Sequence, residues 1–141
     1  MSNDNYTLSR LEDQITFYDT KSQSNQRKYK TIKFCEILLG GLVAVGAGFD
    51  WSNIAIGCFG LLIIVLEGVK NAFQYHYHWM SYRSTCEYLK KEKHFFNAKA
   101  GPYLDAENVE KELAERIEEI ISQEHAKWLK KNHKTKKKSD R

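Results

Sequence analysis

The sequence predicts an all-α fold, a membrane helical hairpin of two transmembrane helices extended by long cytosolic helices and a C-terminal amphipathic helix. Only three of the 40 charged residues, Glu36, Asp50 and Glu67, fall between positions 34 and 69. That apolar segment is interrupted once, by a short polar break at residues 50–53. Elsewhere apolar residues recur at spacings of three and four, which is the helical period. We expect a single two-span domain over residues 1–141.

A cytosolic helix is expected over residues 7–33. Its apolar residues share one helical face: Leu8, Leu11, Ile15 and Tyr18. Ser9 followed by Glu12 fits a capping box ahead of this face. From residue 19 to residue 33 the pattern is polar and basic, without Pro or Gly, so the helix can continue into the apolar segment. These residues contain no apolar run of the kind that a cleaved signal peptide needs.

Two membrane spans are expected at residues 34–49 and 54–69. Each arm of about 16–18 residues covers about 24–27 Å as a helix, near the thickness of a hydrocarbon core. All 22 Lys and Arg lie outside the arms and their turn, with Lys33 ending one arm and Lys70 the other. The positive-inside rule therefore predicts a multi-pass protein of the plasma membrane with both termini in the cytoplasm. Because the uncharged runs are short, a hairpin buried inside a soluble helical bundle is the alternative.

Glycine is concentrated in the same arms, which hold seven of the eight glycines. Each one costs a soluble helix about 1 kcal/mol relative to alanine. Gly40, Ala44 and Gly48 are spaced by four and form a small-residue ridge, which allows close helix packing in lipid. Two spans alone cannot enclose a water-filled path. We therefore expect a homo-oligomer that packs through this ridge.

After the second span, a stalk helix is expected over residues 70–100, because no breaker occurs before Gly101 and Pro102. Its first turns are rich in aromatic residues, as an interfacial belt would be: Tyr75, Tyr77, Trp79 and Tyr82. An amphipathic helix is expected over residues 105–130 and is predicted to fold back on the stalk. Its apolar face comprises Val109, Leu113, Ile117, Ile120, Ile121 and Trp128.

A basic tail, residues 131–141, completes the chain. The run of seven lysines that begins at Lys127 lacks the interleaved aromatic residues of a nucleic-acid stacking platform. We expect it to bind anionic lipid headgroups, so membrane lipid and not nucleic acid is the predicted partner.

Glu36 and Glu67 are the candidate pore-lining residues. Each lies three positions inside the lysine that ends its arm, so both are expected at the same depth near the cytoplasmic face. In an oligomer they can form an acidic ring around a cation path. The alternative is that each carboxylate pairs with its neighbouring lysine at i,i+3.

No catalytic, cofactor or metal site is predicted, and we do not expect an enzyme. The sequence contains no phosphate loop, GxSxG, HExxH or paired Cys/His zinc spacing. His76 and His78 point about 200° apart on a helix and cannot share one ion. The three cysteines show no CxxC pairing and are odd in number, which favours a reducing compartment.

The pattern WxxYRxxxExLKxE followed by GPY resembles the bacterial SLATT-type two-transmembrane proteins, the SMODS- and SLOG-associating effectors and their uncharacterised relatives. The residues that carry the resemblance are Trp79, Tyr82, Arg83, Glu87, Leu89, Lys90, Glu92, Gly101, Pro102 and Tyr103. Together with Tyr18, Asp19 and the basic helix before the first span, the resemblance covers most of residues 15–130.

The resemblance implies a membrane effector of a prokaryotic conflict (antiviral) system that oligomerises into a pore or perturbs the membrane after a nucleotide-linked signal. Since these residues carry no sensor domain, we expect a separate nucleotide-sensing partner protein. The alternative function is a non-conducting, membrane-anchored scaffold that recruits or clusters cytosolic partners. A family motif supports shared architecture better than shared function.

Overall fold

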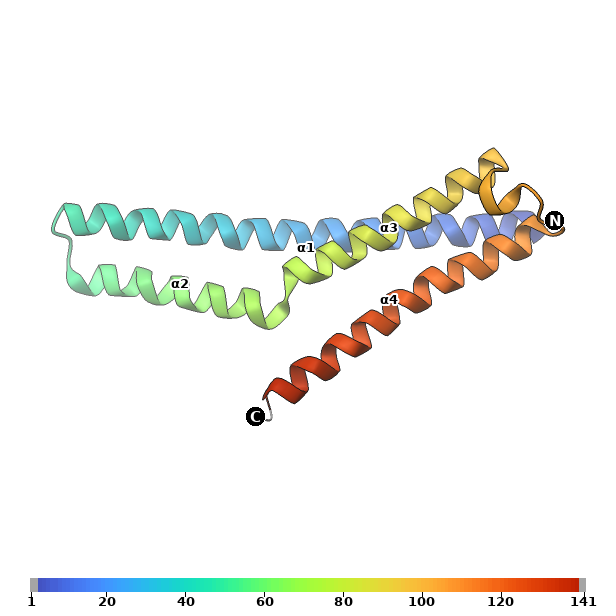
Figure 1. Ribbon diagram of the computed structural model, residues 1–141. Helices are drawn as coiled ribbons and strands as arrows, with labels where there is room; N and C mark the ends of the chain where they lie inside the picture. Colours follow the sequence, from blue (N-terminus) through green and yellow to red (C-terminus); the bar gives the residue numbers. More distant parts are fainter. Residues whose placement is uncertain (1–2, 140–141) are drawn as a thin grey trace. The chain divides into compact units, whose positions relative to one another are not determined.

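In the computed structural model, the backbone is described for residues 3–139 and the side chains for residues 6–127, 129 and 130. Over these residues all the regular structure is helical, as predicted (Figure 1). Helix α1 comprises Asn3–Gly48, α2 Asn53–Phe73, α3 Tyr75–Ala98 and α4 Val109–Ser139. A 3₁₀ turn, η1, lies at Gly101–Tyr103.

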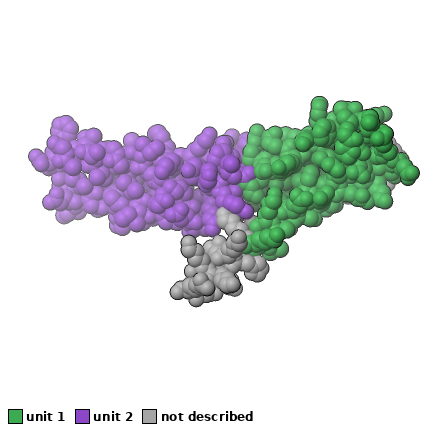
Figure 2. All heavy atoms as spheres, in the orientation of Figure 1, with its two compact units in different colours: residues 1–20, 81–141 green, residues 21–80 purple. Residues whose placement is uncertain are grey.

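The chain divides into two compact units, which are described separately below (Figure 2). Unit 1 contains residues 1–20 and 81–141, and unit 2 contains residues 21–80. Helices α1 and α3 each contribute to both units.

Unit 2 contains the hairpin, whose turn is closed by a helix C-cap. Asp50 adopts a left-handed conformation (φ 52°), and the Trp51 N–H donates to the Gly46 carbonyl at 2.9 Å. This is a Schellman motif, which satisfies carbonyl groups at the end of α1. A Cβ atom on Gly46 would lie 3.0 Å from the Trp51 indole. Glycine at this position therefore lets the indole pack against the end of α1.

The two arms of the hairpin are long and apolar enough to cross a membrane, one within α1 and one in the helical segment that begins at Asn53. Only 11% of the apolar window in the first arm, and 0% of that in the second, is buried inside the chain. Large apolar side chains stand exposed along both arms, among them Phe34, Ile37, Phe49, Ile54, Leu61 and Ile64. Thus the arms are not the buried core of this chain, in contrast to the soluble-hairpin alternative.

The predicted uninterrupted helix over residues 70–100 is wrong at Gln74. This residue is left-handed (φ 46°, ψ 39°) and separates α2 from α3 without a linker. The prediction used Gly and Pro as breakers, and neither occurs here. The rings of Phe73 and Tyr75 stack across the break at 5.5 Å, and the His76 ring lies 5.0 Å from Tyr29 of α1. These contacts accompany a conformation that costs a non-glycine residue about 1–2 kcal/mol.

Unit 1 has an apolar core built from α1, α3, η1 and α4. Its buried members are Leu11, Tyr18, Cys86, Leu89, Tyr103, Leu113 and Ile117. Leu11, Leu89 and Leu113 are each 0% exposed, so one leucine from each of three helices meets in the centre. Burial raises the pKa of the Cys86 thiol, which fits a cysteine that acts as an apolar core residue.

The connection between α3 and α4 is set by local capping. The Ala100 N–H donates to the Phe95 carbonyl at 3.1 Å around the left-handed Lys99, a second Schellman motif. Helix α4 begins later than the predicted residue 105, because the Asn108 side chain caps it by accepting a hydrogen bond from the Lys111 N–H at 3.0 Å.

Two further boundaries differ from the predictions. Helix α4 continues beyond residue 130 to Ser139, so the basic tail is helical over its described part. The capping box at Ser9 is absent, because α1 already begins at Asn3. In both cases the predicted helix was too short, because neither Gly nor Pro marks the end of the observed helix.

The break at Gln74 predicts opposite outcomes for two substitutions. Because glycine adopts the left-handed conformation freely, Gln74→Gly should be more stable than Gln74→Ala by about 1 kcal/mol. An uninterrupted helix would reverse the order by a similar amount, since alanine is the better helix former. Thermal unfolding of the two variants in detergent, followed by circular dichroism, distinguishes the two orders.

Candidate functional site

The two candidate carboxylates meet at a charge cluster in unit 2, formed by Lys33, Glu36, Glu67 and Lys70. The Lys70 ammonium lies 3.2 and 3.1 Å from the two carboxylate oxygens of Glu36 and also pairs with Glu67. Lys33 lies 3.3 Å from Glu36. Lys70 therefore bridges α1 and α2, and it holds both carboxylates at one level of the hairpin.

Burial separates the two carboxylates. The Glu36 side chain is 7% exposed, and its main partner, Lys70, is 12% exposed. The Glu67 side chain is 48% exposed. Both i,i+3 pairings of the alternative interpretation are present, whereas the interhelical pair between Lys70 and Glu36 was not predicted. Formally the four charges cancel, so in this conformation the cluster is neutral.

Beside the cluster lies an open groove of about 430 Å³. It is lined by Lys33, Glu36, Ile37, Ile63, Ile64 and Glu67. Apolar and charged side chains thus share one concave surface on the hairpin. Such a mixture of apolar and charged side chains is what an amphiphile or an amphipathic helix would contact.

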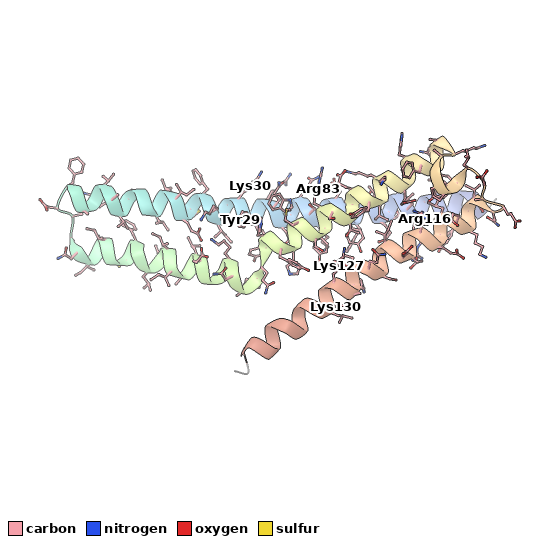
Figure 3. The ribbon with its side chains drawn as sticks, in the orientation of Figure 1. Tyr29, Lys30, Arg83, Arg116, Lys127 and Lys130 are labelled. Atoms are coloured by element: carbon pink, nitrogen blue, oxygen red, sulfur yellow. The ribbon has the colours of Figure 1, made fainter. Side chains whose placement is uncertain are left out.

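An aromatic cluster, formed by Tyr29, His76 and Trp79, also belongs to unit 2. The Tyr29 ring lies 5.0 Å from His76 and 6.3 Å from Trp79, and the His76 and Trp79 rings are 5.4 Å apart (Figure 3 labels Tyr29). The Lys28 ammonium lies 5.8 Å above the Tyr75 ring. Amphipathic rings next to lysines are typical of a membrane–water interface. Of the four residues of the predicted aromatic belt, Trp79 belongs to this cluster, whereas Tyr82 packs against the core of unit 1.

The small-residue ridge does not pack against another element in the described part of the chain. Apart from the neighbouring residues and backbone of the same helix, no described atom lies within 4 Å of where a Cβ on Gly40 or Gly48 would be, and Ala44 is exposed. The same open space surrounds Gly41, Gly57, Gly60 and Gly68. Of the seven arm glycines, only Gly46 makes a close contact that a side chain would disturb.

Four of the motif residues, Tyr82, Leu89, Glu92 and Tyr103, are buried in the core of unit 1 or pack against it. Buried Glu92 accepts hydrogen bonds from the Tyr103 hydroxyl at 2.8 Å and from Arg116 Nε at 2.9 Å (Figure 3 labels Arg116). Burial alone raises the pKa of Glu92, but the hydrogen bonds from Arg116 and Tyr103 outweigh it and hold the pKa below its usual value. Burial and the Glu92 carboxylate raise the pKa of Tyr103. Sequence reasoning missed Arg116, because nothing in the spacing links it to Glu92.

Other motif residues form a surface network with α1. Arg83 pairs with Glu87 at 2.8 Å and with Asp19 at 3.7 Å, and Lys90 lies within 4 Å of both carboxylates. These side chains are about one third to one half exposed, so each pair contributes little to stability.

The remaining motif residues also have structural roles. Tyr82 packs against the core, Gly101 has a positive φ of 61° that favours glycine, and Pro102 lies in the first turn of η1. In the described part of the chain, the motif thus specifies packing, capping and ion pairs.

Comparison with known proteins gave one family. Residues 13–111 match the family described as "Protein of unknown function (DUF4231)". The match includes both arms of the hairpin and the whole WxxYRxxxExLKxE motif. Neither the curated proteins nor the solved structures gave a significant match.

The hydrogen bonds to Glu92 predict a pH-dependent stability. Because its folded-state pKa lies below the unfolded value of about 4.3, the ionised carboxylate stabilises the fold above that value, and this contribution is lost as the pH falls through the folded-state pKa. Glu92→Gln should therefore lower stability at pH 7 by about 1–3 kcal/mol and flatten the decline in acid. Unfolding measured from pH 7 to pH 3 tests this.

Glu87→Gln is the matched control, because it removes an exposed carboxylate from the same helix and should change stability by less than about 1 kcal/mol. Parallel pH profiles for wild type and Glu92→Gln would contradict the assignment.

Proposed function

The chain belongs to the DUF4231 family, and we propose that it is an oligomeric, non-enzymatic membrane effector of the SLATT type that forms a pore or perturbs the bilayer. In this proposal the hairpin spans the plasma membrane with both termini in the cytoplasm. A separate nucleotide-sensing partner protein delivers the signal in an antiviral conflict system.

One observation carries the proposal, namely that the hairpin leaves its apolar and small residues uncovered. Ile54 is 79% exposed, Phe49 75% and Ile64 70%. Monomeric soluble proteins rarely expose a continuous apolar surface of this kind, whereas lipid covers it without cost. Membrane insertion is therefore the simplest account of the two arms.

The open glycines support self-association within that membrane. A helical glycine weakens a helix by about 1 kcal/mol relative to alanine. At six of the seven arm glycines, no close contact in the described structure requires a residue without a side chain. In lipid, small residues are favoured where another helix approaches closely. A neighbouring copy that packs on Gly40, Ala44 and Gly48 would explain their size.

The burial of the carboxylates distinguishes their roles in a pore. Glu67 is half-exposed, so it can turn toward an axis shared by several copies. Glu36 is nearly enclosed and pairs with Lys70 and Lys33. We therefore assign Glu67 as the main carboxylate of the acidic ring and Glu36 as the residue that holds Lys70.

The neutral charge cluster favours the second candidate function, a membrane-anchored scaffold. Two lysines neutralise both carboxylates, so in the described conformation neither has to face an ion path. Unit 1 has its own apolar core and presents an exposed charged surface for cytosolic partners. A scaffold would need the hairpin only as an anchor.

Bulky substitutions on the ridge test self-association. Gly40→Leu combined with Gly48→Leu should shift the protein from oligomer to monomer in mild detergent, because leucine side chains block close helix approach. The control, Leu38→Phe with Val45→Phe, adds bulk at two other exposed positions of the same arm and should leave the oligomer intact. Size-exclusion chromatography with light scattering reports both. An oligomer that survives the glycine substitutions would assign the contact elsewhere.

Dye release from vesicles tests conduction. Purified protein reconstituted into liposomes should release an enclosed small cationic dye, and Glu36→Gln with Glu67→Gln should slow this release severalfold by removing the acidic ring. Because the signal is unidentified, release is compared at increasing protein-to-lipid ratios. Unchanged leak in the double variant removes the acidic ring. No leak from inserted protein at any ratio favours the scaffold.

A further inference from the structure

Helix α4 changes character after Ile121. Before that point Leu113 and Ile117 are buried in the core of unit 1, and Ile120 and Ile121 pack against it. From residue 122 to residue 130 every side chain that the structure describes is exposed, apart from half-buried Glu124. The core-facing stripe of α4 therefore ends at Ile121, about one turn after Ile117, while the helix itself continues to Ser139.

The charge of α4 changes at the same place. Residues 109–124 contain six carboxylates and two basic residues, whereas residues 125–139 contain seven lysines and no acidic residue. Lysines near a helix C-terminus interact favourably with the helix dipole, but seven of them on consecutive turns repel each other. Most helical stability in proteins comes from tertiary packing, so a helix end whose described side chains are exposed and whose lysines repel each other is only weakly stable in water. An anionic partner would stabilise it.

Within unit 1, the side of α4 next to α3 is not closed at this level. A cleft of about 340 Å³ is lined by Tyr82 of α3 and by Glu124, His125 and Leu129 of α4. Leu129 is 52% exposed, and Lys127 and Lys130 lie on either side of it in sequence (Figure 3). The segment thus carries an exposed apolar side chain and lysines that point to other sides of the helix.

We propose that residues 122–139 of α4 bind the surface of an anionic lipid bilayer, with the lysines on the headgroups and Leu129 at the apolar boundary. This inference rests on the proposed function, since the hairpin provides the bilayer. A segment tethered to a membrane meets that surface at a high effective concentration, which favours lipid over nucleic acid as the polyanion. Basic residues beside an exposed apolar residue are typical of interfacial helices. Each lysine at the surface contributes about a fivefold factor to association.

The test is hydrogen–deuterium exchange of the full chain reconstituted into two kinds of vesicle, pure phosphatidylcholine and phosphatidylcholine with about one third phosphatidylserine. Backbone amides of residues 122–139 should exchange at least tenfold more slowly in the anionic vesicles at low salt, and the protection should fade at about 0.5 M salt. Peptides from the core of unit 1 around Leu89 serve as the internal reference and should not change.

Matched variants assign the effect to the lysines. Lys127→Gln, Lys130→Gln and Lys131→Gln together should remove most of the protection, whereas Lys91→Gln, Lys99→Gln and Lys111→Gln remove the same charge elsewhere and should preserve it. If both triple variants lost the same amount of protection, the protection would depend only on net charge, and the proposal would be overturned.

The remaining outcomes separate this inference from the proposed function. Protein that floats with phosphatidylcholine vesicles but shows equal exchange in both vesicle types is inserted, and only the role of α4 is overturned. Protein that fails to float with phosphatidylcholine overturns insertion itself, and with it the premise of the inference. Protection by a short DNA duplex but not by phosphatidylserine would assign α4 to nucleic acid instead.

Discussion

The apolar side chains of the hairpin have to be kept from water by something outside this chain. None of the apolar window in the second arm is buried by the rest of the described structure. Burying one large apolar side chain stabilises a protein by about 1.5–3 kcal/mol relative to leaving it in water. The exposed arms therefore become much more stable once lipid or other copies cover them. The other features of the hairpin fit this constraint: unbroken helical hydrogen bonding in each arm, lysines at the arm ends away from the turn, and an aromatic cluster near those lysines.

The two units are each held together by different interactions. Unit 1 buries leucines from three helices as a water-soluble domain does, and its buried carboxylate, Glu92, is satisfied by two donors. The hairpin of unit 2 relies on a cross-helix ion pair at Lys70 and on the fit of Trp51 against Gly46. Most residues of the WxxYRxxxExLKxE motif specify the architecture of unit 1.

Local signals could be predicted from the sequence, and long-range contacts could not. The arms, the short turn and the apolar faces follow from composition and spacing, and the structure contains them. The break at Gln74 carries no Gly or Pro, so only the aromatic contacts around it show where the helix stops. The pairs between Lys70 and Glu36 and between Arg116 and Glu92 join different helices, and no periodicity in one segment encodes such a pairing.

The ion pairs of the charge cluster would keep a pore of the proposed kind in a non-conducting state. A pore that conducts cations through Glu67 needs that carboxylate turned toward the path, whereas here it shares the Lys70 ammonium with Glu36. Exchanging these partners in a low-dielectric setting costs several kcal/mol unless other subunits supply new ones. The described conformation is therefore a resting arrangement if the protein conducts. A signal that changes the packing between copies would have to break the ion pairs of Lys70 with Glu36 and Glu67. A ligand can shift the equilibrium between the resting and conducting states only by its difference in affinity for the two. If the protein is a scaffold, the same ion pairs need never open, and Lys70 simply joins the inner ends of the two arms.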